Sequence, residues 1–238
     1  FSLILIVEGQ QELDWRLAVG AVISSALHIA YSLILQAGYE RAELGVVYPI
    51  ARGSGPVLTI LFATLLMGER ISPGALLGAF IVIAGIFVVT GNPFRSGSRP
   101  LQGMLWGAAT GTAIAGYTLW DGYSVISLHL DPVRYYASTL LLQSLILTPG
   151  AMRRRNRIPT AVRVDIIPIL IIAVCSPLAY ILVLTAMQSM PLALVAPLRE
   201  TSIIVGSLLS YWLFRENHLA RRIAGAVVVL TGIAIISL

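Results

Sequence analysis

The chain has 238 residues, of which 57% are hydrophobic and only 11% are charged, and its mean hydropathy is +0.87. A water-soluble domain carries roughly 25% charged residues, so this chain has too little charge to cover a surface that faces water. All 16 basic residues are arginines, and the net charge of the whole chain is +5. They occupy short gaps between apolar runs and form no continuous basic face, which argues against nucleic-acid binding.

Eight apolar runs predict eight membrane-spanning helices. Most are close to the roughly 20 residues that cross a hydrocarbon core of about 30 Å. The segment before the first run looks like the tail of a further helix, too short to span, and the chain starts with Phe. The sequence therefore predicts an all-α membrane protein. The runs cover 15–36, 46–67, 74–92, 101–121, 132–150, 166–187, 191–213 and 221–238.

The chain repeats itself at an offset of 147 residues, the difference between positions 52 and 199. This indicates two homologous halves, 1–92 and 101–238, each a five-helix unit. The first unit then lacks its first helix and most of its second, so that ten helices are expected and about eight are complete. An odd number of helices per unit predicts that the halves insert with opposite orientation. The polar and glycine matches are Arg52 with Arg199, Glu69 with Glu216, Gly78 with Gly225, and Gly85 with Gly232.

The loop charges agree with an inverted repeat. The loop at 8–16 is net acidic, whereas its repeat counterpart at 153–165 is strongly basic. Cytoplasmic loops carry an excess of arginine and lysine, so equivalent loops of opposite charge indicate opposite orientation. We expect the arginine-rich side to face the cytoplasm, in a multi-pass protein of the cell (inner) membrane.

Two stretches carry a family resemblance. "LLMGERISPGALLGAFIVIAGIFVV" and its second copy "WLFRENHLARRIAGAVVVLTGIAII" resemble the EamA domain of the drug/metabolite transporter superfamily, in which a helix ending in Gly-Glu-Arg precedes a glycine-containing last helix. Pro49 and Pro197, at the start of the preceding helix in each half, also fit. The resemblance implies ten helices in two inverted repeats around a central cavity, with export of amino acids, other small metabolites or drugs.

Arg52 lies about 9 Å into an apolar run by helical rise. Its guanidinium can snorkel to the membrane interface, line a cavity where it meets a carboxylate or phosphate, or pair inside the membrane with Glu200. Its recurrence at Arg199 adds support to the cavity interpretation, and snorkelling stays the first alternative. The inverted repeat places the two arginines on opposite sides of the midplane, at the two mouths of one cavity. The neighbouring Gly53, Ser54 and Gly55 are typical of close helix packing.

A polar and aromatic stripe ends in Tyr117, Trp120 and Asp121. These residues are either belt residues at the membrane interface or cavity residues, in which case the aromatic rings contact substrate and Asp121 binds an amine or a proton. Tyr48, Tyr180 and His28 are weaker candidates, since interior packing also explains them. Cys175 lies in an apolar run and is expected to be an inert core residue.

The sequence contains no pattern of an enzyme, a metal site or a nucleotide-binding loop, so we expect no cofactor and no catalysis. The leading hypothesis is a secondary transporter that exports small metabolites such as amino acids by alternating access. The alternatives are a proton-coupled multidrug efflux protein and a non-transporting membrane assembly subunit. The expected partners are a small-molecule substrate and the lipid bilayer, with a monomer or homodimer as the assembly.

The loop charges generate a prediction about topology. In a chain whose Cys175 is replaced by serine, a cysteine introduced beside Arg155 should react with an impermeant maleimide only from the cytoplasmic side. A cysteine beside Gln11 should react only from outside. Labelling of both from one side would contradict the inverted repeat.

Overall fold

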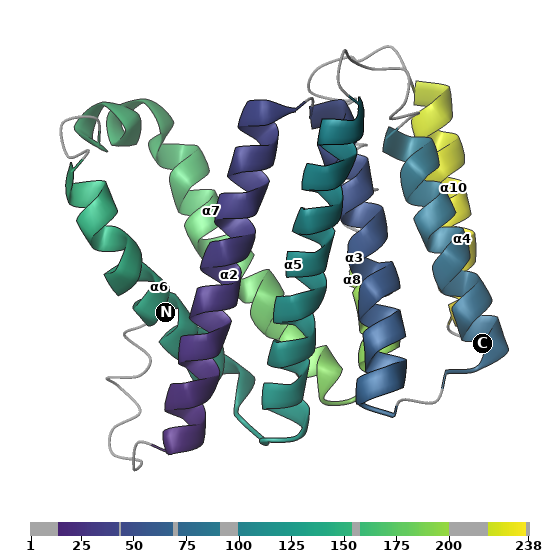
Figure 1. Ribbon diagram of the computed structural model, residues 1–238, viewed down its shortest axis with the longest axis horizontal. Coiled ribbons are helices and arrows are strands. Elements are labelled where there is room, and N and C mark those ends of the chain that lie inside the picture. The colour runs from purple at the N-terminus through teal and green to yellow at the C-terminus, as the bar shows by residue number, and fades with distance from the viewer. Residues whose placement is uncertain are drawn as a thin grey trace. The chain divides into compact units, whose positions relative to one another are not determined.

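The computed structural model describes residues 14–42, 44–68, 71–90, 100–153, 158–199 and 219–236. All regular elements in these ranges are α-helices, which confirms the all-α prediction (Figure 1). Helix starts and ends agree with the apolar runs to within a few residues in most cases. The helices are α2 (Trp15–Arg41), α3 (Leu44–Leu66), α4 (Pro73–Thr90), α5 (Pro100–Ile126), α6 (Pro132–Arg153), α7 (Ile158–Met187), α8 (Leu192–Arg199) and α10 (Leu219–Ile236).

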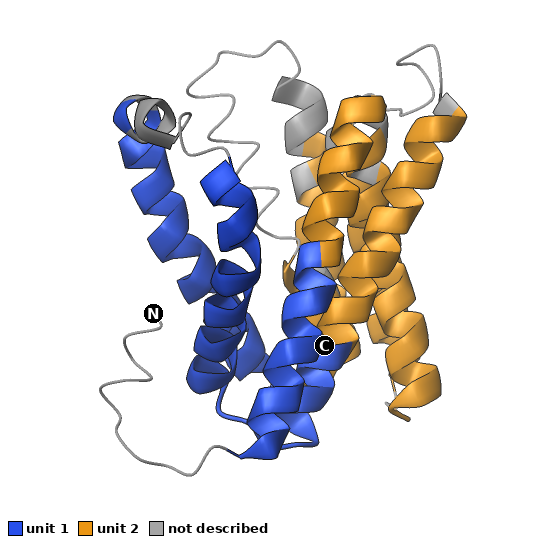
Figure 2. Cartoon of the chain, turned by 60° about the vertical axis from the view of Figure 1, so that its left-hand side comes forward, with its two compact units in different colours: residues 1–29, 120–189 blue, residues 30–119, 190–238 orange. Residues whose placement is uncertain are grey.

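The chain divides into two compact units, coloured in Figure 2. Unit 1 consists of residues 1–29 and 120–189, and therefore contains the first half of α2, the end of α5, and α6 and α7. Unit 2 consists of residues 30–119 and 190–238. It contains the rest of α2, the first part of α5, and α3, α4, α8 and α10. Each unit brings together segments that are far apart in sequence.

Two of the described helices are long and apolar enough to cross a membrane. They are α2 and the part of α7 from Asp165 to Met187, which follows a non-helical residue at Asp165. Only 6% of the apolar window in α7 is buried, and Ile167 and Ile172 are 68% and 65% exposed. The core helix of a water-soluble protein would bury such residues, so this exposure favours contact with lipid. Shorter apolar helices lie at Ile50–Leu66 and Pro73–Val88.

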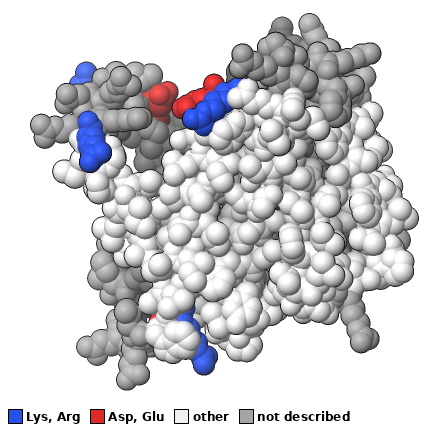
Figure 3. Space-filling model, viewed as in Figure 1, with Lys and Arg blue, Asp and Glu red and all other residues white. Residues whose placement is uncertain are grey.

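Charged side chains of the described residues are concentrated at helix ends. Arg41 and Arg153 lie in the last turns of α2 and α6, and Asp14 caps the start of α2 by accepting a bond from the backbone N–H of Arg16 at 3.0 Å. On the face drawn in Figure 3, the surface between these ends is uncharged. This distribution is the one a bilayer requires, because ionised groups stay at the aqueous interfaces unless they have buried partners.

Two sequence expectations need correction. The run at 101–121 ended at Asp121, but α5 continues to Ile126, so Asp121 lies inside the helix. Cys175 was expected in the core, yet it is exposed. The two errors have different causes: a polar residue ends an apolar run without ending the helix, and an apolar run does not tell whether a residue faces lipid or core. Of the run at 191–213, only α8 lies within the described residues.

Helices α4 and α10 pack closely within unit 2, side by side and antiparallel (Figure 1). A Cβ atom added to Gly85 would lie 2.6 Å from Val229 Cγ2 and 3.0 Å from the Gly225 carbonyl oxygen. A Cβ atom added to Gly232 would lie 2.8 Å from Val82 Cγ2 and 2.7 Å from the Gly78 carbonyl oxygen. Adding 147 to the residue on α4 and subtracting 147 from the residue on α10 converts each contact of Gly85 into a contact of Gly232. Such reciprocal contacts are those of an interface with local two-fold symmetry.

Small residues of α3 also permit close packing, as the sequence predicted. A Cβ atom added to Gly53 would lie 2.8 Å from the Phe87 ring of α4, and one added to Gly55 would lie 3.1 Å from Ile114 of α5. Gly111 of α5 in turn approaches the Gly55 backbone. The helices meet at these positions because no side chain holds them apart. They fix the segment of α3 that carries Arg52.

The reciprocal contact of α4 and α10 generates a prediction about stability. Gly85→Ala and Gly232→Ala should each destabilise the protein by about 1–3 kcal/mol, because the new methyl group meets backbone atoms that cannot move away. The two effects should be similar, because the contacts are equivalent. Gly74→Ala, in the same helix as Gly85 but with only Ser72 Oγ within 4 Å at 3.9 Å, is the matched control. Thermal denaturation in detergent measures all three, and an unaltered Gly232→Ala variant would contradict the equivalence.

Candidate functional site

The carboxylate of Asp121 lies completely buried in unit 1 and is surrounded by hydrogen-bond donors. Oδ1 accepts from Ser24 Oγ at 2.7 Å and from the Tyr135 hydroxyl at 2.6 Å. Oδ2 accepts from the Tyr180 hydroxyl at 2.6 Å and lies 2.9 Å from His28 Nε2. Each oxygen therefore has two partners, which fills the roughly four acceptor sites of a carboxylate. We call these five residues the carboxylate cluster.

Four helices contribute to the carboxylate cluster. Ser24 and His28 lie one turn apart on α2, so their side chains share one face. Asp121 comes from α5, Tyr135 from the first turn of α6, and Tyr180 from the second half of α7. A buried polar group without partners costs several kcal/mol, so the four hydrogen bonds restrict how these helix segments can slide past one another.

Aromatic contacts surround the His28 ring. Its centroid lies 5.4 Å from the Tyr180 ring in an edge-to-face arrangement and 6.2 Å from the Tyr136 ring. Tyr136 and Tyr180 also contact each other, at 4.7 Å. Tyr136 is buried, and 12% of the His28 side chain remains accessible. The imidazole is thus held by rings on two sides while part of it can still meet solvent.

The burial of Asp121 argues against the interface role that the sequence left open for it. A belt residue at the interface would be exposed, but Asp121 is 0% exposed and hydrogen-bonded by three other helices. Trp120 points elsewhere: its indole N–H donates to the Gly20 carbonyl oxygen at 3.0 Å and its ring lies 5.8 Å from Tyr123. In the described contacts Trp120 joins α5 to α2 and does not touch the carboxylate.

A second polar cluster lies in unit 2. The guanidinium of Arg52 lies 5.5 Å from the centroid of the Tyr48 ring, one turn earlier on α3. The guanidinium of Arg199 lies 5.8 Å from the Tyr117 ring centroid and donates to the Tyr117 hydroxyl at 3.4 Å. Both arginines are partly buried, and Tyr117 is only 7% exposed. Each cation therefore lies against the face of an aromatic ring.

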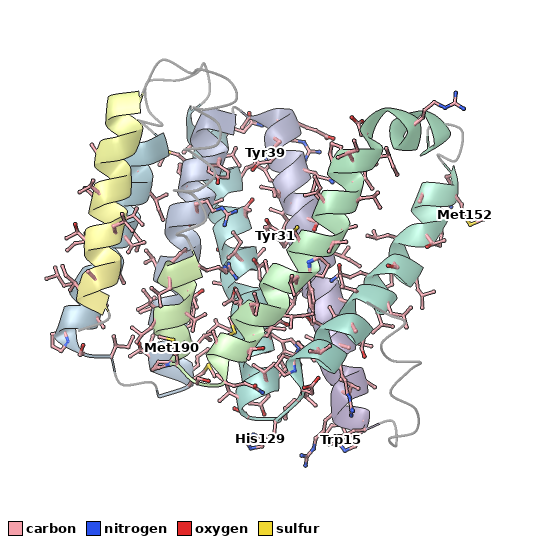
Figure 4. All side chains as sticks on the ribbon, turned by 180° about the vertical axis from the view of Figure 1, so that it is seen from behind. Trp15, Tyr31, Tyr39, His129, Met152 and Met190 are labelled. Atoms are coloured by element: carbon pink, nitrogen blue, oxygen red, sulfur yellow. The ribbon has the colours of Figure 1, made fainter. Side chains whose placement is uncertain are left out.

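Tyr31 of α2 lies beside the pair of Tyr117 and Arg199. Its ring lies 5.3 Å from that of Tyr117, and α3 and α8, which carry the two arginines, pack against each other within unit 2. Figure 4 labels Tyr31 in the middle part of α2, with Trp15 at the start of that helix and Tyr39 near its end. We call Tyr31, Tyr48, Arg52, Tyr117 and Arg199 the arginine–tyrosine cluster.

Most of the candidates from the sequence fall into these two clusters, and Trp120 does not. Asp121 and Tyr180 meet in unit 1, whereas Tyr48, Arg52, Tyr117 and Arg199 belong to unit 2, and Glu200 lies outside the described residues. Ser24, Tyr31 and Tyr135 were not among the candidates. The signal that could have found the residues on α2 is their spacing, because Ser24 and His28 are polar, one turn apart and inside a long apolar helix.

The chemistry of both clusters is that of binding. Two guanidinium groups and several phenols can hold an anionic group, and a carboxylate beside an imidazole can hold a proton. Among the described residues, no group of three or more His, Cys, Asp or Glu side chains could hold a metal ion.

Long apolar helices with exposed apolar side chains, together with charged groups held in their interior, are features of helical membrane proteins. The sequence profile of the EamA-like transporter family matches residues 1–91 and 101–238. Because the match covers nearly the whole chain, the protein belongs to this family. It is therefore a member of a family of integral membrane transporters for small molecules, as the resemblance of its sequence implied.

The proteins that are similar to the chain include a named transporter and a protein of known structure. The multidrug transporter PA4990 of Pseudomonas aeruginosa (strain PAO1) is 39% identical over 61 residues, which are 26% of this chain and 54% of that protein. The match thus spans about half the length of this curated relative. A protein of known crystal structure aligns with 98% of this chain and 81% of its own, with a TM-score of 0.72 and 17% identity. At that identity the likeness shows the fold alone.

The carboxylate cluster generates a prediction about stability. Tyr135→Phe should lower the free energy of unfolding by about 1.5–3 kcal/mol, because it removes one donor from a buried charged acceptor. Tyr123→Phe is the control, since Tyr123 of α5 lies outside the carboxylate cluster and is 42% exposed. Denaturant titration in detergent micelles compares the two, and equal stability of both variants would contradict the role of Tyr135.

Proposed function

We propose that the protein is a secondary transporter that exports small metabolites, such as amino acids, across the cell (inner) membrane by alternating access. The observation that carries the proposal is the arginine–tyrosine cluster. A charge at membrane depth costs from a few to more than ten kcal/mol, depending on how it is measured. Two arginines at repeat-related positions, each lying on a tyrosine ring within an apolar helical unit, are explained by binding of an anionic group.

The chemistry of this cluster favours a carboxylate substrate. A guanidinium binds a carboxylate through two parallel hydrogen bonds, and phenol hydroxyls can add further donors. Tyr31 contacts Tyr117, which accepts from Arg199, so a small solute bound beside Tyr31 would lie close to the Arg199 guanidinium. Amino acids and other small carboxylates have the right charge for such a site.

The proposed architecture is two inverted repeats, residues 1–92 and 101–238. The reciprocal, antiparallel packing of α4 on α10 supports it, because a two-fold axis across the helices relates two halves that insert with opposite orientation. In this arrangement Arg52 and Arg199 lie on opposite sides of the membrane midplane. Alternating access then amounts to movement of the helices around a site near Tyr31.

Multidrug efflux is the second candidate function. It is favoured by the relative PA4990, which is named a multidrug transporter. The two candidates differ in the charge they require of the substrate. Labelled amino acids and ethidium, a lipophilic cation, therefore separate them in one assay.

Arg52→Lys and Arg199→Lys test the proposal. Each change keeps the charge but removes the bidentate geometry, so the apparent affinity for a transported amino acid should fall about ten- to hundred-fold. Arg52→Lys should weaken loading from the cytoplasmic side more, and Arg199→Lys exchange from outside. The assay is flux of a panel of ¹⁴C-labelled L-amino acids in both directions through oriented proteoliposomes.

Arg41→Lys is the matched control for these variants. Arg41 also lies on an aromatic ring, 5.1 Å from Trp106, but it is exposed at the end of α2 and outside the cluster. Its flux should equal that of the unaltered protein. Wild-type flux in both cluster variants would show that the arginines only snorkel. Transport of ethidium without any amino acid would favour multidrug efflux instead.

A further inference from the structure

The part of unit 1 where α6 ends and α7 begins is exposed on every side. All residues from 144 to 153 of α6 and from 165 to 176 of α7 are exposed. Each stretch is about three turns long, so no face of either helix is covered. The rest of α7 differs, because Pro177, Ile181 and Leu184 are buried at helical spacing. We call residues 144–153 and 165–176 the exposed arm.

The exposed arm is apolar except at one end. Its only charged residues are Arg153 and Asp165, which stand where the two helices approach their connection. Such a surface needs an apolar environment, which in a membrane is either lipid or another helix. The side chains that are more than half exposed include Leu145, Ile146 and Leu147 on α6 and Ile167, Ile171 and Ile172 on α7.

A second helix does not account for this surface. A helix partner covers one face and approaches closely only at small residues, whereas the arm is exposed all round. Its only glycine is Gly150, and a Cβ atom added there would meet nothing within 4 Å. Gly85, by contrast, lies against the backbone of α10. Acyl chains surround a helix on all sides, so lipid is the environment that fits the arm.

Arginines lie at the charged end of the arm. Arg153 is in the last turn of α6, and Arg163 precedes the non-helical Asp165, which sets the start of α7 off from its apolar span. Both arginines are exposed, and neither forms a hydrogen bond or an ion pair within the described residues. In the sequence, residues 153–165 contain five arginines and one aspartate, a net charge of +4. Charged side chains gather at this corner in Figure 3, where α6 ends and α7 begins in the same view of Figure 1.

We propose that the exposed arm is a binding site for an anionic phospholipid of the cytoplasmic leaflet. The phosphate binds at Arg153 and Arg163, and the acyl chains lie along residues 144–153 and 165–176. A guanidinium binds a phosphate through two parallel hydrogen bonds, and a basic segment beside a membrane helix attracts anionic headgroups. The two parts of the surface thus match the two parts of the ligand. The site is separate from the arginine–tyrosine cluster and does not depend on which solute is transported.

The experiment is native mass spectrometry of the whole chain in detergent. The chain is titrated with phosphatidylglycerol or phosphatidylcholine of identical dioleoyl chains. Phosphatidylglycerol should bind about tenfold more tightly or better, because it alone carries a net negative charge. The double variant Arg153→Gln, Arg163→Gln should weaken its binding about 25-fold, roughly fivefold for each arginine, and leave phosphatidylcholine unchanged.

Arg16→Gln is the matched control. Arg16 is also exposed and belongs to the same unit, but it lies in the first turn of α2. That turn is at the other end of the unit, because an added Cβ atom on Gly20 would contact Leu130 and Tyr135 near the start of α6. Figure 4 labels Trp15 and Met152 at these opposite ends. The control should bind phosphatidylglycerol as the unaltered chain does.

Two further titrations separate a lipid from a free anion. Inorganic phosphate in excess should not displace phosphatidylglycerol, because it has no acyl chains. Phosphatidylglycerol with hexanoyl chains should bind about tenfold more weakly or worse, because it covers less of the apolar arm. Displacement by inorganic phosphate would show an ion site and overturn the lipid site.

Three other results would also overturn the proposal. They are equal binding of the two dioleoyl lipids, unchanged phosphatidylglycerol binding by the double variant, and a dimer that carries no phosphatidylglycerol, which would show that a second copy covers the arm. Neither exchanged arginine has a partner within the described residues, so the double variant should fold, and its thermal denaturation should match that of Arg16→Gln.

Discussion

The burial of one carboxylate determines much of the structure of unit 1. Removing Asp121 from water costs several kcal/mol unless its oxygens are fully bonded, and the chain supplies donors from α2, α6 and α7 to meet that cost. Hydrogen bonds are directional, whereas apolar contacts are not. In a bilayer, apolar contacts between helices are also weakly favoured, because lipid solvates apolar side chains as well as other helices do. The carboxylate therefore fixes the register of helix segments that apolar packing alone would leave free to slide.

Unit 2 is held together by close helix packing at glycines. There, Gly85 and Gly232 bring the backbones of α4 and α10 into contact, and Gly53 and Gly55 let side chains of α4 and α5 pack directly on α3. Close approach at these points leaves little freedom for the α3 segment that carries Arg52. A charged side chain that binds a solute needs a rigid helix to position it. The small residues next to Arg52 allow the close packing that keeps this part of α3 rigid. Packing and binding are thus linked along one helix.

The sequence was a good guide to the fold and a weaker one to the site. Hydropathy located the helices because a bilayer demands some 20 apolar residues per span. It misjudged the end of α5, since Asp121 ends an apolar run but not the helix that tertiary hydrogen bonds extend around it. It also placed Cys175 in the core although the residue is exposed, because lipid and core demand the same apolar chemistry. The partners of Asp121 could not be read from sequence, since Ser24 lies 97 positions away and hydroxyl groups in apolar helices are common.

The central claim is that solute reaches the arginine–tyrosine cluster from both sides of the membrane in turn. The most direct measurement is labelling of Tyr31→Cys by an impermeant maleimide, in a chain whose only cysteine, the exposed Cys175, is replaced by serine. Vesicles of both orientations are compared. Alternating access predicts that position 31 reacts from either side, and that saturating amino acid slows the reaction from both. Reaction from one side only, or from neither, would contradict the account, because a residue used only for packing is never exposed to both compartments.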